Sequence, residues 1–246
     1  PGKTTTTVNL AYELSRIGQK VLVLDFDGQA DTTKYFKQLD TDFYIGDLLL
    51  DRKFDIAKAI YPAIVNNQQQ ENLHIIPGRR GDAMSKLDID MISLPKREER
   101  LSRHLAAIKD KYDFILIDTN PGTSVLGLNA VTAASEFIFP TEFKEHSIDG
   151  VETLLEHIED VTFIEESELK YLVVPTKVSK IAKKSLNYGK AYLSERWPDN
   201  TAKTTIWERA IFVEAEQDHE PVSVLKPGHE AAMYYKDLAK EVLANV

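Results

Sequence analysis

The sequence predicts an α/β fold in which helices cover both faces of a doubly wound, mostly parallel sheet. Short runs of Val, Ile, Leu and Phe alternate along the chain with segments of helical periodicity, the pattern of a parallel sheet between helical layers. Hydrophobic residues make up 43% of the 246 residues, which is enough for one continuous core. We see no linker, so we expect a single domain over residues 1–246.

The expected elements follow from apolar spacing. In the first helix, Leu10, Leu14 and Ile17 recur at helical spacing, and Gly18 stands where a left-handed residue would end it. We expect the Gln68–Gln70 tract to lie in a surface loop. Strands are expected at residues 21–24, 73–76, 114–117, 137–139, 171–174 and near 205–207. Two later helices are expected from the apolar stripes Val151, Leu154, Leu155, Ile158 and Ala231, Tyr235, Leu238, Val242.

The composition excludes several classes of protein. The longest apolar runs are far shorter than the roughly 20 residues that span a bilayer, so we expect no transmembrane helix. The chain has no cysteine, which rules out disulfides, thiolate nucleophiles and cysteine-ligated zinc or iron–sulfur sites, and this fits a reducing cytoplasm. The six histidines are scattered without the spacing of metal ligands.

Charge is segregated along the chain although the net charge is −9. Residues 141–169 carry ten acidic side chains against Lys144 alone, whereas residues 177–203 carry seven basic side chains against two acidic ones. The negative total argues against a protein that coats nucleic acid over its whole surface. The basic segment still permits a local basic face, although either segment could be only a solvated helix surface.

The chain opens with half of a phosphate-binding loop. Gly2-Lys3-Thr4-Thr5 runs directly into the first expected helix, which matches the G-K-[ST] end of such a loop. A glycine there lets backbone amides approach phosphates, the lysine supplies a point charge, and the hydroxyl of Thr4 can ligate magnesium. By itself a G-K-T sequence is equally compatible with an ordinary loop that enters a helix.

Acidic residues end two of the expected strands. Asp25 and Asp27 follow the run 21–24, and Asp118 follows the run 114–117. Ligands of open α/β sheets bind at the carboxyl ends of strands, so the two acidic strand ends and the glycine–lysine turn are expected to meet in one crevice. An acid that ends one strand is often only a turn former, but three such features in order favour a nucleotide site.

Residues 2–11, 23–29 and 112–119 resemble the ParA family of partition ATPases, within the deviant Walker A class that also includes MinD-type proteins. They read GKTTTTVNLA, VLDFDGQ and YDFILIDT. The stretch 212–222 is similar to the family's segment ahead of its last helix. The chain departs from the family pattern at Gly28 and Asn120, and at Trp207-Glu208 where the family has its adenine-pocket pair. Pro1 takes the variable slot of the loop, and the family's first strand and signature lysine would precede it.

The resemblance implies a P-loop ATPase that binds ATP and magnesium as a homodimer. By position, Gly2, Lys3, Thr4 and Thr5 contact phosphates, and Thr4 and Asp118 hold the magnesium ion. Asp27 positions the attacking water, and Asp25 supports either Asp27 or the Thr4 site. Lys3, Asp25 and Asp27 are the expected catalytic residues. Since phosphoryl transfer depends mainly on placing the water and neutralising charge, removal of Asp27 is expected to slow hydrolysis and to spare ATP binding.

The resemblance also implies partners. We expect nonspecific DNA binding by the dimer, a centromere-binding ParB-like activator, slow intrinsic turnover, and a cytoplasmic location with nucleoid association when ATP is bound. Lys177, Lys180, Lys183 and Lys184 are the expected DNA contacts.

Three alternatives stay open. A MinD-like ATPase would position a protein cargo, but the last eleven residues have mixed charges and lack the Lys/Arg-rich polar face of an interfacial anchor, so we expect no membrane contact. A small-molecule ligase could use the same phosphate loop. A scaffold with a decayed nucleotide site is disfavoured because Lys3, Thr4, Asp25, Asp27 and Asp118 are all present.

Overall fold

The computed structural model describes residues 2–120 and 122–245, so Pro1 lies outside the described residues. These residues group into two compact units. The four-stranded unit contains residues 11–134 and 219–221, and the two-stranded unit contains residues 2–10, 135–218 and 222–245, in each case as far as described. The first helix, α1 (Lys3–Arg16), contributes residues to both units. The proposal of a single domain stays a prediction.

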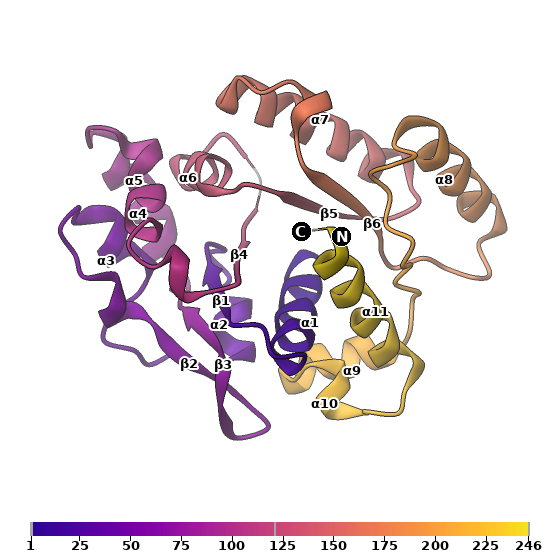
Figure 1. Cartoon of the computed structure of the whole chain (residues 1–246), viewed down its shortest axis with the longest axis horizontal. Coiled ribbons are helices and arrows are strands. Elements are labelled where there is room, and N and C mark those ends of the chain that lie inside the picture. Colours follow the sequence, from indigo (N-terminus) through magenta and orange to yellow (C-terminus); the bar gives the residue numbers. More distant parts are fainter. Residues whose placement is uncertain (1, 121, 246) are drawn as a thin grey trace. The chain divides into compact units, whose positions relative to one another are not determined.

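The four-stranded unit holds a mixed sheet with the order β2-β3-β1-β4 (Figure 1). Strands β3 (Gln68–Ile76), β1 (Val21–Asp25) and β4 (Phe114–Asp118) are parallel, and β2 (Tyr61–Val65) pairs antiparallel with β3 at the edge. In this register Asp25 lies beside Asp118. The short elements around the sheet are α2 (Asp31–Tyr35), α3 (Ile45–Leu50), η1 (Ile56–Ala59), α4 (Asp82–Ile92), η2 (Arg97–Glu99), α5 (Arg100–Leu105), η3 (Lys109–Lys111) and α6 (Val125–Ala133).

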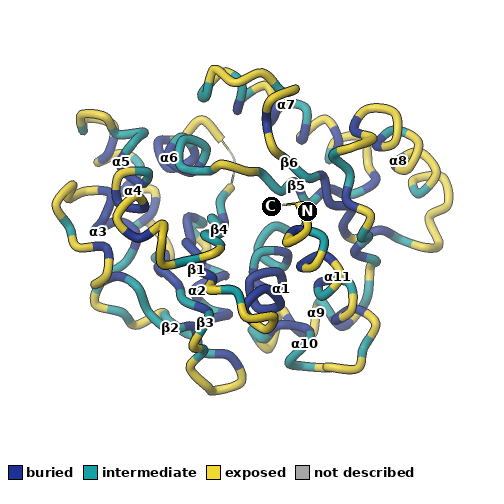
Figure 2. The backbone as a smooth tube through the Cα atoms, in the orientation of Figure 1, coloured by how far each residue is buried: buried dark blue, intermediate teal, exposed yellow. Residues whose placement is uncertain are grey.

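Strand β1 is buried along its whole length, because neighbours cover both of its faces. Leu22 and Leu24 pack into an apolar cluster with side chains of α3, α4, α5 and α6, among them Leu48, Met84 and Leu101. The alternate residues of β1, which point to the opposite face, are fully buried as well. A strand covered on both sides is what a doubly wound sheet requires, and Figure 2 shows β1 in the colour of buried residues.

The two-stranded unit is built on a β-α-β crossover. Strands β5 (Phe137–Thr141) and β6 (Tyr171–Pro175) are parallel, and α7 (Glu145–Thr162) and η4 (Glu166–Glu168) connect them. The four apolar positions predicted for the last helix are all buried in α11 (Glu230–Asn245), and in α7 only Leu154 of the predicted stripe is less than fully buried. The remaining helices are α8 (Lys183–Arg196), α9 (Ile211–Asp218) and α10 (Val222–Leu225).

Strand β2 was not predicted, and the Gln68–Gln70 tract is part of β3 rather than a loop. Asn66 and Asn67 both have positive φ, at 51° and 57°, so they form the kind of two-residue turn that joins hairpin strands. Strand β2 could not be predicted because it contains Pro62, and proline is tolerated in a sheet only at an edge strand or a bulge. The pairing of β2 with β3 does shift register between Pro62 and Ile64. The polar start of β3 is exposed because the hairpin tip projects from the sheet (Figure 2).

The strand predicted near residues 205–207 is wrong. The segment makes only isolated bridges, Thr201 with Val173 and Trp207 with Val178. Between them, the amides of Lys203 and Thr204 donate to the carboxylate of Glu241 on α11, at 2.6 and 3.0 Å, so they are not available to a continuous ladder.

The first helix ends at Arg16, and Gly18, predicted as the left-handed residue at this end, has φ 91°. Ile17 was expected on the buried stripe but is 44% exposed, because α1 stops one residue before it. No helix in the described part of the chain has the length and apolar character needed to cross a bilayer. The α/β fold class with a mostly parallel sheet is confirmed.

Candidate functional site

The phosphate-loop residues lie in the two-stranded unit, at the start of α1. Gly2 has φ +84°, in the left-handed region that favours glycine, and its carbonyl accepts the amide of Thr6 at 2.9 Å, so helical bonding starts at once. The first turn contains no acidic side chain. The partial positive charge of the helix N-terminus is therefore not neutralised within α1, and Lys3 adds a full charge beside it.

Two polar side chains fix this start of α1 within the unit. Asn9 donates to the carbonyl of Thr5 at 2.8 Å and accepts the amide of Val222 at 2.9 Å, so it joins α1 to α10. Thr6 is buried, and its hydroxyl lies 3.4 Å from that of Tyr235 on α11. The loop residues thus rest on a helix whose inner face is held by hydrogen bonds.

Lys177 lies next to the phosphate loop. A Cβ atom placed on Gly2 would meet the Lys177 Cε at 3.8 Å, and Lys177 itself has a left-handed backbone, with φ 50°. Burial alone would raise the pKa of Glu142, but the neighbouring Lys144 and Lys177 ammonium groups bring it below its ordinary value. The structure thus gives Lys177 surroundings different from those of the other three lysines predicted to contact DNA.

Those three lysines surround the start of α8. Lys183 and Lys184 are exposed in its first turn, and the Lys180 ammonium group lies 5.1 Å from the centre of the Trp207 ring. Ile181, between them, is 91% exposed. Figure 2 shows the start of α8 in the colour of exposed residues.

The acidic residues lie in the four-stranded unit, at the carboxyl ends of β1 and β4. Asp25 is fully buried and accepts the amide of Asp27 at 3.1 Å and the amide and hydroxyl of Thr33 at 2.8 and 2.6 Å. Burial raises the pKa of Asp25 to about 7, the negative charge of Asp118 adds to this rise, and the Thr33 bonds oppose it.

Asp118 and Asp27 occupy different surroundings. Asp118 is 2% exposed, and one of its oxygens accepts the hydroxyl of Thr32 at 2.7 Å. Asp27 is half-buried, with one oxygen accepting the amide of Gln29 at 2.9 Å and the other accepting the side-chain amide of Asn120 at 2.8 Å. The buried Asp118 carboxylate is therefore suited to bind a metal ion in a fixed position. The more accessible Asp27 carboxylate is suited to accept a hydrogen bond from a bound molecule.

Four supporting residues were not predicted as site residues: Thr32, Thr33, Gly78 and Asn120. The amide of Gly78 donates to the Thr33 hydroxyl at 2.9 Å, which directs that hydroxyl toward Asp25. A side chain at Gly78 would bring a Cβ atom to 2.8 Å from the Asp25 carbonyl. None of the four carries a local sequence signal, since the fold brings them from three separate segments: Thr32 and Thr33 from α2, and Gly78 and Asn120 from two loops.

The acidic cluster does not form a complete protein cage for a metal. Within residues 2–120 and 122–245, no three His, Cys, Asp or Glu side chains are arranged to hold one. Magnesium is nonetheless compatible with the arrangement, because it keeps several waters and takes only one or two carboxylates when it also binds phosphate.

Comparison with known proteins identifies the family. An AAA domain family matches residues 1–171. The Bacillus subtilis sporulation initiation inhibitor protein Soj is 30% identical over 249 residues, which cover 99% of this chain and 94% of that protein. The chain belongs to the ParA/MinD family of ATPases.

Further members and fold neighbours agree with this assignment. The Treponema pallidum chromosome-partitioning ATPase Soj is 28% identical, with 99% of this chain and 92% of that protein covered. The solved structure of apo McdA from Cyanothece superposes with a TM-score of 0.82 at 21% identity, covering 98% and 94% of the two chains. Cobyrinic acid a,c-diamide synthase from Mycobacterium smegmatis, solved with an ATP analogue and magnesium, gives 0.77 at 22% identity, covering 98% and 89%. These two structures show the P-loop fold.

Proposed function

We propose that this ParA/MinD family ATPase is a DNA-partition switch for a plasmid or chromosome. It binds ATP with magnesium, dimerises in that state, holds DNA without sequence preference, and hydrolyses ATP when a centromere-binding, ParB-like partner engages it. The observation that carries the proposal is the similarity to two Soj proteins over almost the full length of all three chains, one of them a chromosome-partitioning ATPase.

In this proposal the start of α1 receives the phosphates. The Lys3 ammonium group stabilises the β and γ phosphates, Gly2 lets backbone amides approach, and Thr5 contacts the inner phosphates. The absence of an acid in the first turn supports this role, because a carboxylate there would repel the ligand.

The acidic residues serve the metal and the water. Thr4 and Asp118 are the proposed magnesium ligands, and bound magnesium supplies charge neutralisation at the phosphate oxygens. Asp27 orients the attacking water through a carboxylate that Gln29 and Asn120 hold in position. Asp25 accepts the Asp27 amide and so fixes the turn that carries it.

DNA binding is proposed for the surface around the start of α8. A few lysine–phosphate contacts give binding that falls steeply with salt, without base recognition. The double variant Lys183→Glu, Lys184→Glu is therefore expected to lose the ATP-dependent gel shift of a DNA duplex at low salt. Lys109→Glu, Lys111→Glu makes the same change of charge at exposed positions of η3 and should keep the shift.

The outcome separates the alternatives. If the α8 double variant shifts DNA like the parent chain, the DNA surface is misassigned. If the parent chain shifts no DNA with ATP but floats with liposomes, a MinD-like role replaces the proposed one. A ligase on the same fold would instead show ATP consumption that depends on a small-molecule acid and not on DNA.

A further inference from the structure

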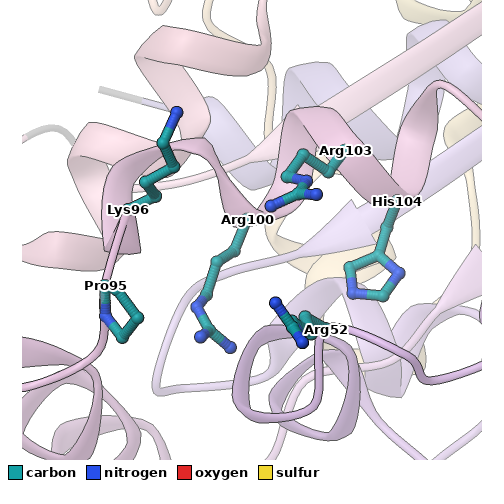
Figure 3. A pocket seen from close by; sticks show the side chains of 6 residues that line it. All are labelled: Arg52, Pro95, Lys96, Arg100, Arg103 and His104. Carbon is teal, nitrogen blue, oxygen red and sulfur yellow. The ribbon is translucent and has the colours of Figure 1, made fainter.

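A pocket in the four-stranded unit is lined by basic side chains and no acidic ones. Its walls are Arg52, Pro95, Lys96, Arg100, Arg103 and His104 (Figure 3). They come from the loop after α3, the turn before η2, and α5. None of them belongs to the proposed nucleotide site. The pocket has a volume of about 110 Å³, well below the roughly 300–1,000 Å³ of sites that enclose a drug-sized ligand.

Arg100 provides a buried positive charge at this pocket. The residue is 8% exposed, and its Nη1 donates to the carbonyls of Leu49 and Leu50 at 2.8 and 3.0 Å, at the end of α3. Its Nε is buried and has no hydrogen-bond partner in the described part of the chain. An unsatisfied buried donor is costly, because the group has lost water without gaining an acceptor.

Two further guanidinium groups, those of Arg52 and Arg103, line the pocket. Arg52 and Arg103 are exposed, and neither guanidinium group forms a hydrogen bond or ion pair with a residue in the ranges 2–120 and 122–245. Figure 3 shows Arg52, Arg100, Arg103 and His104 directed toward a common space. Lys96 points away from that space and pairs with Glu99 at 3.2 Å.

We propose that this pocket binds a small phosphate-bearing anion, held by Arg52 and Arg103 at the rim and by Arg100 at the floor. Guanidinium groups match phosphate oxygens in two-pronged geometry, and the volume accommodates one or two phosphoryl groups. The proposal is independent of the ATPase cycle. Because Arg52 follows α3 and Arg103 belongs to α5, the bound anion would also tie these two segments together and stabilise the fold.

Inorganic pyrophosphate is a suitable probe, titrated by calorimetry in magnesium-free buffer. The full chain carrying Lys3→Ala serves as background, so that the phosphate loop does not contribute heat. We expect one site, with affinity weakened about tenfold by Arg52→Ala and by Arg103→Ala. Pyrophosphate should raise the thermal midpoint of the background protein, and at the same concentration it should raise that of either variant less. Arg16→Ala, an exposed arginine at the end of α1, is the matched control and should bind as the background does.

Three outcomes would overturn the assignment. One is the absence of saturable binding at millimolar pyrophosphate. Another is unchanged affinity in both pocket variants, which would place the anion elsewhere. The last is displacement of pyrophosphate by a short DNA duplex with loss of duplex binding in the pocket variants, which would assign the arginines to a DNA backbone. Arg52 and Arg103 are exposed, so neither variant is expected to impair folding.

Discussion

Asp25 and Asp118 bring two carboxylates together at the ends of neighbouring strands, and burial makes the first of them hard to ionise. Hydrogen bonds from Thr33 and from the Asp27 amide reduce the free-energy cost of ionising the buried Asp25 but do not remove it, since its pKa is still raised to about 7. In the proposed function Asp118 binds magnesium, and Asp25 fixes the turn that carries Asp27.

This pair makes stability depend on pH in the metal-free, nucleotide-free protein. The folded pKa of about 7 lies above the ordinary 3.8, so the contribution of protonated Asp25 is fully present below about pH 4 and is lost as the pH rises through 7. We expect urea titrations to show that this group lowers the free energy of unfolding by on the order of 4 kcal/mol as the pH rises from about 4 to above 7. Asp25→Asn should flatten the profile in that window, and an equal slope in both proteins would contradict the assignment.

Gly78 is required because the chain passes close to the Asp25 backbone. A Cβ atom at this position would lie 2.8 Å from a carbonyl oxygen, a contact that only a backbone shift can relieve. We expect Gly78→Ala to lower the free energy of unfolding by about 1–3 kcal/mol. In contrast, Gly150 lies within helix α7, and a Cβ atom added there would meet no neighbouring atom. Gly150→Ala should therefore raise the free energy of unfolding by roughly 0.5–1 kcal/mol. Denaturant titration of both variants checks the difference in sign.

At the scale of elements, the edge hairpin β2–β3 depends on its turn. Asn66 and Asn67 each adopt positive φ, which asparagine tolerates and β-branched residues resist. Asn67→Gly is therefore expected to stabilise the protein by up to about 1 kcal/mol, and Asn67→Val to destabilise it by a similar amount. Thermal unfolding measures both, and the reverse order of midpoints would show that the turn does not set the conformation.

The elements also show which parts of the fold the sequence determines locally. Strands β1, β4, β5 and β6 were predictable because each is a short apolar run that ends in a polar or turn residue. Strand β2 was not, since Pro62 interrupts its pattern and the edge position that tolerates proline is a tertiary property. The 205–207 segment failed for a similar reason, because Glu241, far along the chain, takes its neighbours' amides.

The same division applies to the candidate site. Gly2, Lys3, Thr4 and the acids of β1 and β4 could be predicted, because a glycine–lysine turn before a helix and an acid after a strand are local signals. The four supporting residues could not be predicted, because they act through hydrogen bonds or close packing with residues up to 93 positions away in the sequence. They are Thr32, Thr33, Gly78 and Asn120. The arginine pocket likewise joins residues 52 and 103, which no local motif connects.

At the scale of the whole molecule, we propose that this ATPase acts as a switch. Such a protein must hold ATP long enough for its dimeric, DNA-bound state to act, so slow intrinsic hydrolysis is part of the proposed function. Binding and hydrolysis should then depend on different residues. Lys3 serves both, whereas Asp27 serves only the placement of the attacking water.

The most direct test is to measure ATP affinity and hydrolysis side by side for the parent chain and Asp27→Ala, with magnesium. We expect the variant to lose at least about tenfold in hydrolysis rate while its affinity for ATP stays within about threefold. Hydrolysis at the parent rate, or loss of affinity together with rate, would contradict the role proposed for Asp27 and with it the assignment of the site.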